Sequence, residues 1–120
     1  MVKPTASRGE QVKEVLALVD RIKEILSEKK AEDVVALDLT KVSDTLDYFV
    51  IATAQSTPHL QALEGHLEEK LQELSLKPKP VERSPRWVVL DYGEVVVHLM
   101  SREARAFYDL EGFWADAERI

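Results

Sequence analysis

The sequence contains no cysteine, which excludes a disulfide framework and any zinc site built on cysteine ligands. Asparagine is absent as well, and the loss of both thermolabile residue types is typical of a thermophilic protein. The glycines stand scattered at positions 9, 65, 93 and 112, so the chain has no glycine-rich phosphate loop. These absences remove the most recognisable cofactor and metal sites.

Long apolar runs and an excess of positive charge are also missing. No run approaches the roughly 18 residues of a membrane span, and the first eleven residues lack the apolar centre of a signal peptide. We therefore expect a cytoplasmic protein with no membrane partner. The net charge of −6 argues against binding nucleic acid by neutralising phosphates. If the protein acts on a nucleic-acid assembly, we expect it to contact a protein component, and a basic one.

Hydrophobic periodicity predicts one α/β domain over residues 1–120, with residues 1–8 as candidates for disorder. Helical spacing covers residues 8–30 and 56–74, and apolar runs rich in β-branched and aromatic residues predict strands at 33–40 and 47–53. A short edge strand is expected around Val81, then a hairpin over 87–100, then one or two short helices whose Phe107, Leu110 and Trp114 share a packed side. This order predicts a single mixed sheet of about five strands, with helices on at least one face.

The stretch WVVLDYGEVVVHLM, residues 87–100, predicts two strands joined by a tight turn at Tyr92–Gly93. With that turn, Asp91 lies opposite Glu94, and the next pairs outward are Val89 with Val96 and Trp87 with His98. Because side chains alternate along a strand, these six residues share one face. The other face is wholly apolar and requires a core beneath it: Val88, Leu90, Val95, Val97 and Leu99.

The mixed face of this hairpin has two interpretations. It is a solvated face on which the C-terminal helix half covers Trp87, or it is a docking surface, because interface centres favour an aromatic anchor surrounded by polar groups. Tyr92 at the tip of the turn would extend such a surface. The two interpretations are compatible, since a sheet face can be partly covered and still bind a partner.

Evidence for catalysis is weak. His59 and His66 are seven residues apart on one helix, which is two turns rather than the single turn that suits shared metal ligation. Asp38, Asp47 and Asp91 lie in or beside strands, where carboxylates can gather around a metal, but such acids are also common in structural roles. Ser56 lacks the setting of a nucleophile elbow.

Four segments resemble the ribosomal silencing factor family, also called Iojap or RsfS: VVALDLT, DYFVIAT, WVVLDYGEVVVHLM and REARAFYDLEGFW. The resemblance covers roughly residues 10 to 116. It implies a nucleotidyltransferase-like fold without the catalytic motif, no enzymatic activity and no cofactor. It also implies a repressor of translation that binds the large ribosomal subunit through its ribosomal protein fourteen and blocks joining of the small subunit when nutrients are scarce.

Motif by motif, the resemblance places the family's binding region on the hairpin, at Trp87, Asp91 and Tyr92. Val89, Glu94, Val96 and His98 follow from the shared face alone. The resemblance further implies a homodimer when the protein is free. The chain departs from the family pattern at Ala54 and Pro58, where a glycine and a nearby arginine are usual, and around Arg83.

Two other function classes remain open from the sequence. One is a nucleotidyltransferase-like enzyme in which the strand-borne aspartates hold Mg²⁺. The other is a homodimeric scaffold that pairs through the same face of the hairpin.

Overall fold

The computed structural model describes residues 8–120, and its chain alternates helices and strands much as the periodicity predicts. Arg8 is the first residue of α1, and residues 1–7 of the segment expected to be disordered lie outside the described residues. The helices are α1 (Arg8–Glu28), α2 (Thr57–Gln72), α3 (Arg102–Tyr108) and α4 (Leu110–Phe113). The strands are β1 (Glu32–Asp38), β2 (Tyr48–Ala54), β3 (Lys79–Arg83), β4 (Trp87–Asp91), β5 (Val95–Ser101) and β6 (Glu118–Arg119).

The strands form one mixed sheet in the order β3-β4-β5-β2-β1-β6. Only β2 and β5 are parallel, because α2 and the β3–β4 hairpin return the chain between them. Every other neighbouring pair is antiparallel. The predicted α/β class and mixed sheet are therefore confirmed. The edge strand β6 was not predicted, because two residues are too few to show a periodic pattern.

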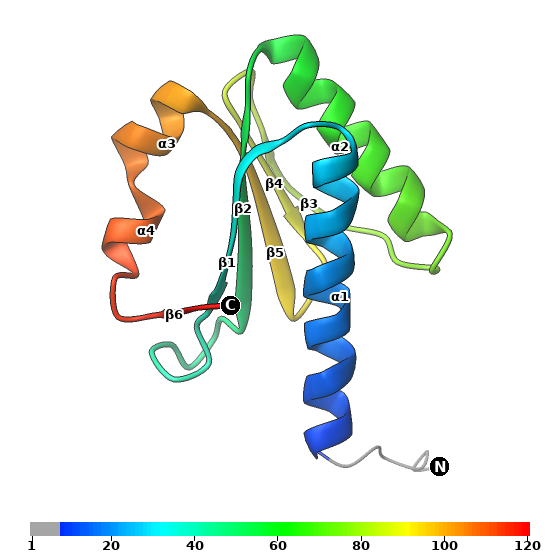
Figure 1. Cartoon of the computed structure of the whole chain (residues 1–120), viewed down its shortest axis with the longest axis vertical. Helices are drawn as coiled ribbons and strands as arrows, with labels where there is room; N and C mark the ends of the chain where they lie inside the picture. The colour runs from blue at the N-terminus through cyan, green and yellow to red at the C-terminus, as the bar shows by residue number, and fades with distance from the viewer. Residues whose placement is uncertain (1–7) are drawn as a thin grey trace.

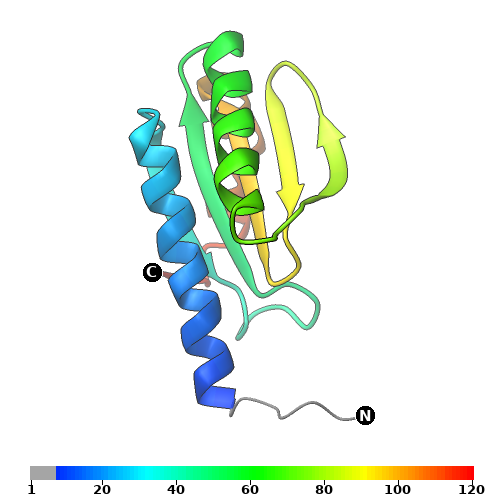
Figure 2. The ribbon, with the colours of Figure 1, turned by 90° about the vertical axis from the view of Figure 1, so that its right-hand side faces the viewer.

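Helices lie on both faces of the sheet (Figure 1). α1 and α2 pack side by side on one face, and α3 and α4 lie over the other, before the chain returns to the sheet edge as β6. Figure 2 shows that the β3–β4 hairpin extends beyond the edge of α2. Each face therefore has its own core, and the residues of β4 and β5 divide between the two.

The larger core lies between the sheet and the α1–α2 layer. It contains the apolar stripes of both helices, such as Ile22 and Leu67, together with Val88 and Leu99 from the hairpin. The smaller core, on the opposite face, is built around Phe49, Ile51 and Met100. The wholly apolar side predicted for the hairpin thus faces the larger core, as alternation requires.

Local signals explain where the helices begin. Ser56 is the N-cap of α2, and its hydroxyl accepts a hydrogen bond from the His59 backbone N–H at 3.1 Å. Ser101 caps α3 in the same way, through the Ala104 backbone N–H at 3.1 Å. None of the helices in the described part of the chain is long and apolar enough to cross a membrane.

Candidate docking surface

The register of the β4–β5 hairpin differs from the predicted one by a shift of the turn. Trp87 lies opposite Met100, Val89 opposite His98 and Asp91 opposite Val96. The backbone N–H of Tyr92 donates to the carbonyl of Val95 at 2.9 Å, so the two turn residues are Gly93 and Glu94.

The prediction of a Tyr92–Gly93 turn is therefore wrong. Gly93 has a φ of 91°, a conformation that glycine adopts without steric cost, and this conformation favours Gly93 as the first residue of the turn. Moving the turn changes the cross-strand partners and leaves the alternation within each strand intact. Trp87, Val89, Asp91, Val96 and His98 accordingly remain on one face.

Tyr92 and Glu94 leave the predicted set for different reasons. Tyr92 ends up on the opposite face, 8% exposed within the larger core, so the prediction that it extends the outer surface is wrong. Burial is the main cause that raises the pKa of its hydroxyl. Glu94 is exposed in the turn rather than on the strand, and its carbonyl accepts a hydrogen bond from the Tyr48 backbone N–H at 3.0 Å.

The C-terminal segment covers part of the outer face of the hairpin. Trp114 and Leu110 pack against the smaller core, and the ring of Trp114 lies 6.4 Å from that of Phe49. Trp87 is half-buried, with its ring 4.6 Å from that of Tyr108 in α3. The expectation that the C-terminal helix half covers Trp87 is therefore confirmed.

Three aromatic side chains of the same segment remain exposed: Phe107 at 81%, Tyr108 at 52% and Phe113 at 77%. The prediction that Phe107 packs with Leu110 and Trp114 is wrong for Phe107 and correct for the other two. Ring contacts connect two of these side chains to the hairpin, since Phe107 lies 5.0 Å from Tyr108 and Tyr108 contacts Trp87, whereas Phe113 lies 5.0 Å from Trp114. We call Trp87, Phe107, Tyr108 and Phe113 the aromatic surface.

Sequence periodicity missed this surface because a seven-residue helix offers too few turns to separate a packed side from an exposed one. Acidic side chains accompany it. Glu103 and Asp109 are exposed at the two ends of α3, whereas Asp91 and Glu94 stand at the turn end of the hairpin, away from Trp87 and α3. Exposed aromatic groups with acidic neighbours suit a partner that is itself basic.

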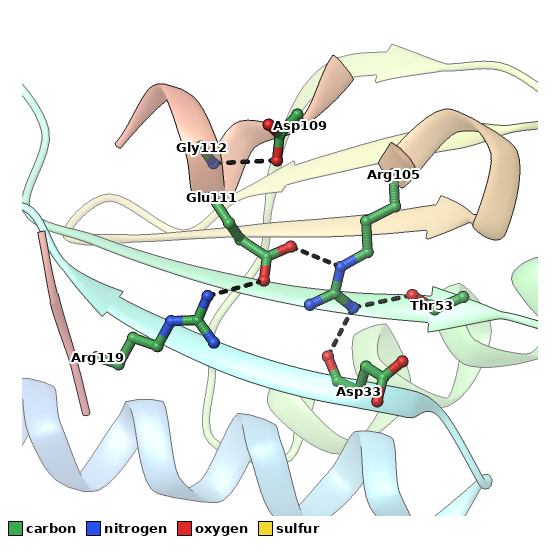
Figure 3. A network of polar contacts seen from close by, with 7 residues as sticks. All are labelled: Asp33, Thr53, Arg105, Asp109, Glu111, Gly112 and Arg119. Atoms are coloured by element: carbon green, nitrogen blue, oxygen red, sulfur yellow. Dashed lines mark hydrogen bonds and ion pairs between the residues drawn. The ribbon is translucent and has the colours of Figure 1, made fainter. Parts of the chain in front are cut away.

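One arginine holds the C-terminal segment on the sheet (Figure 3). The side chain of Arg105, in α3, donates to Oε1 of Glu111 at 2.8 Å, to the carbonyl of Asp33 at 2.6 Å and to the hydroxyl of Thr53 at 2.8 Å. It thereby connects α3 to α4, β1 and β2. Arg119 of β6 approaches the other oxygen of Glu111 at 3.5 Å. The hydrogen bond from Arg105 is the main cause that lowers the pKa of Glu111.

A tight turn between α3 and α4 completes this arrangement. Asp109 adopts the left-handed conformation, with a φ of 43°, and its carboxylate accepts a hydrogen bond from the Gly112 backbone N–H at 3.1 Å. A Cβ atom at position 112 would collide with the Asp109 side chain, so the glycine allows this close approach. The sequence pattern assigned no role to Arg105, Asp109 or Glu111, and the role of Arg105 depends on Asp33 and Thr53, which are distant in the chain.

His98 lies beneath the outer face and is 6% exposed. Its Nδ1 accepts a hydrogen bond from the indole N–H of Trp87 at 3.1 Å, and its ring lies edge-on to Phe49 at 4.5 Å. Burial lowers the pKa of His98 to about 4, so the imidazole is neutral at neutral pH. The prediction that His98 shares a face with Trp87 is correct, but its side chain is covered.

The aspartates considered for catalysis do not form a metal site. Among the residues that the structure describes, no group of three or more histidine, aspartate or glutamate side chains is placed to hold a metal ion. Asp38 accepts hydrogen bonds from the backbone and hydroxyl of Thr40 at 2.9 and 2.5 Å, and Asp91 accepts one from the Gly93 N–H at 2.8 Å. Both carboxylates therefore stabilise turns.

The chain is similar to proteins of one family along nearly its whole length. A family model described as "Ribosomal silencing factor during starvation" matches residues 12–120. A ribosomal silencing factor from Halalkalibacterium halodurans is 38% identical over 97 residues, which cover 79% of this chain and 83% of that protein. The resemblance inferred from the sequence motifs is confirmed.

Two further similarities extend this comparison. The mouse protein named mitochondrial assembly of ribosomal large subunit protein 1 is 30% identical over 101 residues, which cover 80% of this chain and 44% of that protein. The crystal structure of a protein from Chromobacterium violaceum superimposes with a TM-score of 0.75 at 30% identity, covering 82% of this chain and 85% of that one.

Proposed function

Because the chain belongs to the ribosomal silencing factor family, whose members act on the ribosome, we propose that it binds the large ribosomal subunit through ribosomal protein fourteen and blocks joining of the small subunit. The protein represses translation in this way when nutrients are scarce, in the cytoplasm and without enzymatic turnover. It needs no cofactor and little or no direct contact with RNA.

The observation that carries this proposal is the aromatic surface on the outer side of the hairpin and on α3–α4. Clusters of exposed apolar side chains often mark interaction sites on a monomer. Phe107 and Phe113 are more than three-quarters exposed, so burying them against a partner removes much apolar area from water. The surface lies on the face of the sheet opposite the α1–α2 layer, where α3 and α4 carry three of its four side chains (Figure 1).

Charge supports a basic protein as the partner. The net charge of the chain is −6, and Asp91, Glu94, Glu103 and Asp109 stand near the hairpin end and around α3. Opposite charges accelerate the encounter of two proteins, whereas the buried aromatic groups supply most of the affinity. Repression then requires only that the bound protein occupies space that the small subunit needs.

Sedimentation of the purified protein with isolated ribosomal subunits tests the proposal. We expect it to move with large subunits and not with small ones, and to lower the yield of whole ribosomes when both subunits are mixed. A protein that stays free of large subunits at low salt would contradict the proposal.

Two substitutions test the surface itself. Trp87→Ala removes the half-buried anchor, and Asp91→Arg places a positive charge before a basic partner, so both variants should bind large subunits more weakly. Lys41→Ala, an exposed residue between β1 and β2, is the matched control and should bind as the wild type does. If both variants fold, as circular dichroism can confirm, and bind with wild-type affinity, the partner does not bind through this surface. The proposed role on the ribosome would be unaffected.

A homodimer is the second state that this surface favours, because exposed aromatic groups can pair with a second copy. We propose that the free protein is a dimer through the aromatic surface and that the ribosomal partner replaces the second copy. Light scattering at several concentrations measures the mass, and Phe107→Ala should shift it toward the monomer. A dimer that survives this substitution would place the pairing surface elsewhere.

A further inference from the structure

His98 combines two properties that a core residue rarely has together. It is buried in an apolar layer beside Phe49 and Met100, yet only one of its two ring nitrogens has a partner within the described residues. Nδ1 accepts the hydrogen bond from the Trp87 indole, which leaves Nε2 buried without an acceptor. Buried polar atoms are almost always paired, so an unpaired one requires an explanation, and at His98 the contact with Trp87 offers one.

The hydrogen bond from Trp87 determines the tautomer of the imidazole. An indole nitrogen only donates, so Nδ1 of His98 must carry a lone pair and the proton of the neutral ring must stand on Nε2. That N–H group is the one without an acceptor. An apolar side chain at position 98 would avoid this cost and would suit the smaller core, which is otherwise built from aliphatic and aromatic groups.

This cost is offset by the hydrogen bond that fixes the orientation of the Trp87 indole. The indole is covered on one side by the exposed ring of Tyr108, which is tilted by 44° and itself half in solvent. Stacking alone tolerates rotation of the indole about its side-chain bonds, whereas a hydrogen bond from its nitrogen to a fixed acceptor does not. His98 is such an acceptor, because β5 is paired on both sides and the imidazole ring is buried against Phe49.

We propose that His98 is a positioning residue of the docking surface: its Nδ1 holds the Trp87 indole in the orientation that the ribosomal partner binds. This inference rests on the proposed function. His98 does not contact the partner and acts through Trp87. A surface whose anchor is ordered before binding loses less conformational entropy in the complex, which raises the affinity.

The test compares two substitutions of His98 in the free protein and in the complex. His98→Asn places a carbonyl oxygen near the position of Nδ1 and retains an acceptor, whereas His98→Leu retains only bulk. The indole N–H resonance of Trp87, assigned by its loss in Trp87→Phe, should keep its shift and slow solvent exchange in His98→Asn. In His98→Leu it should move and exchange faster.

Affinity for isolated large subunits should follow the same order. His98→Leu should bind roughly three- to tenfold more weakly, as expected when one side chain must be ordered on binding, and His98→Asn should bind as the wild type does. In a Trp87→Phe background, which has no indole N–H, the same His98→Leu change should have no further effect.

The outcomes separate the inference from the function on which it rests. If the wild type binds large subunits and His98→Leu binds equally well, the positioning role is overturned and the proposed function stands. An effect of His98→Leu that is as large in the Trp87→Phe background as in the wild type also overturns it, because His98 would then act independently of Trp87. A wild type that does not bind large subunits overturns both.

Discussion

The guanidinium of Arg105 and the carboxylate of Glu111 meet at 2.8 Å, and this ion pair joins the two short helices that carry the exposed aromatic groups. Their side chains are only 13% and 21% exposed, so water screens the pair weakly. Few fully buried side chains hold these two helices on the sheet, because Ala104 is the one buried residue of α3 and α4 has none. The position of the aromatic surface therefore depends on these polar contacts together with the packing of Leu110 and Trp114 on the smaller core.

Replacing Arg105 should destabilise the protein. Arg105→Gln removes the partner of the partly buried Glu111 and breaks contacts to Asp33 and Thr53, so we expect a loss of about 2–4 kcal/mol in the free energy of unfolding. Urea denaturation measures this loss. Arg119→Gln is the control, because Arg119 is exposed and its contact with Glu111 is long; it should cost less than about 1 kcal/mol. Equal losses in the two variants would contradict the central role of Arg105.

Stability should fall in mild acid because of His98. The folded pKa of about 4 lies below the ordinary value of 6.5, so the unfolded chain takes up the proton first as the pH falls. The contribution of the neutral imidazole is complete above pH 6.5 and is lost as the pH falls to about 4. At about 1.4 kcal/mol for each pH unit, this interval corresponds to about 3 kcal/mol.

Urea denaturation of the wild type and His98→Leu across this interval tests the assignment. The variant has no imidazole to protonate, so its stability should depend less on pH between 6.5 and 4. The lowered pKa of Glu111 also makes stability fall in acid, but its loss comes as the pH drops through its folded pKa, which lies below 4.5. Parallel pH profiles in the two proteins would show that His98 is not the source.

Removing the exposed aromatic groups should weaken partner binding and leave stability unchanged. Phe107→Ala combined with Phe113→Ala deletes two side chains that the folded monomer scarcely buries, so the free energy of unfolding should change by less than about 1 kcal/mol. Affinity for large subunits should fall by roughly tenfold or more, as for central interface aromatics. Leu74→Ala is the control, an exposed apolar residue that follows α2, and it should bind as the wild type does.

Tyr92→Phe should be neutral or slightly stabilising. The Tyr92 hydroxyl is buried without a hydrogen-bond partner in the described part of the chain, so its removal should raise the free energy of unfolding by up to about 1 kcal/mol. Binding to large subunits should not change, because the ring faces the α1–α2 layer. Weakened binding in a variant of unchanged stability would show that the Tyr92 hydroxyl takes part in docking.

Whether a feature was predicted correctly depends on how far apart in the sequence the residues that determine it lie. The strands and long helices were predictable because an alternating or helical pattern of apolar residues is local and repeats several times. The turn of the hairpin was predicted one residue early, since Tyr92–Gly93 and Gly93–Glu94 both contain the glycine that such a turn requires. The pairing of β5 with the distant β2 and the burial of Tyr92 favour the second, and neither contact is visible locally.

The sequence alone determined the α/β class, the two faces of the hairpin and the family, because each depends on the order and period of nearby residues. Only the tertiary structure decided which residues of the outer face are accessible. It covered His98, turned Tyr92 to the opposite core and left Phe107 and Phe113 exposed on short helices. The reason is physical: exposure depends on what packs above a residue, and here that cover is the C-terminal segment, held by Arg105 through contacts more than fifty residues away in the chain.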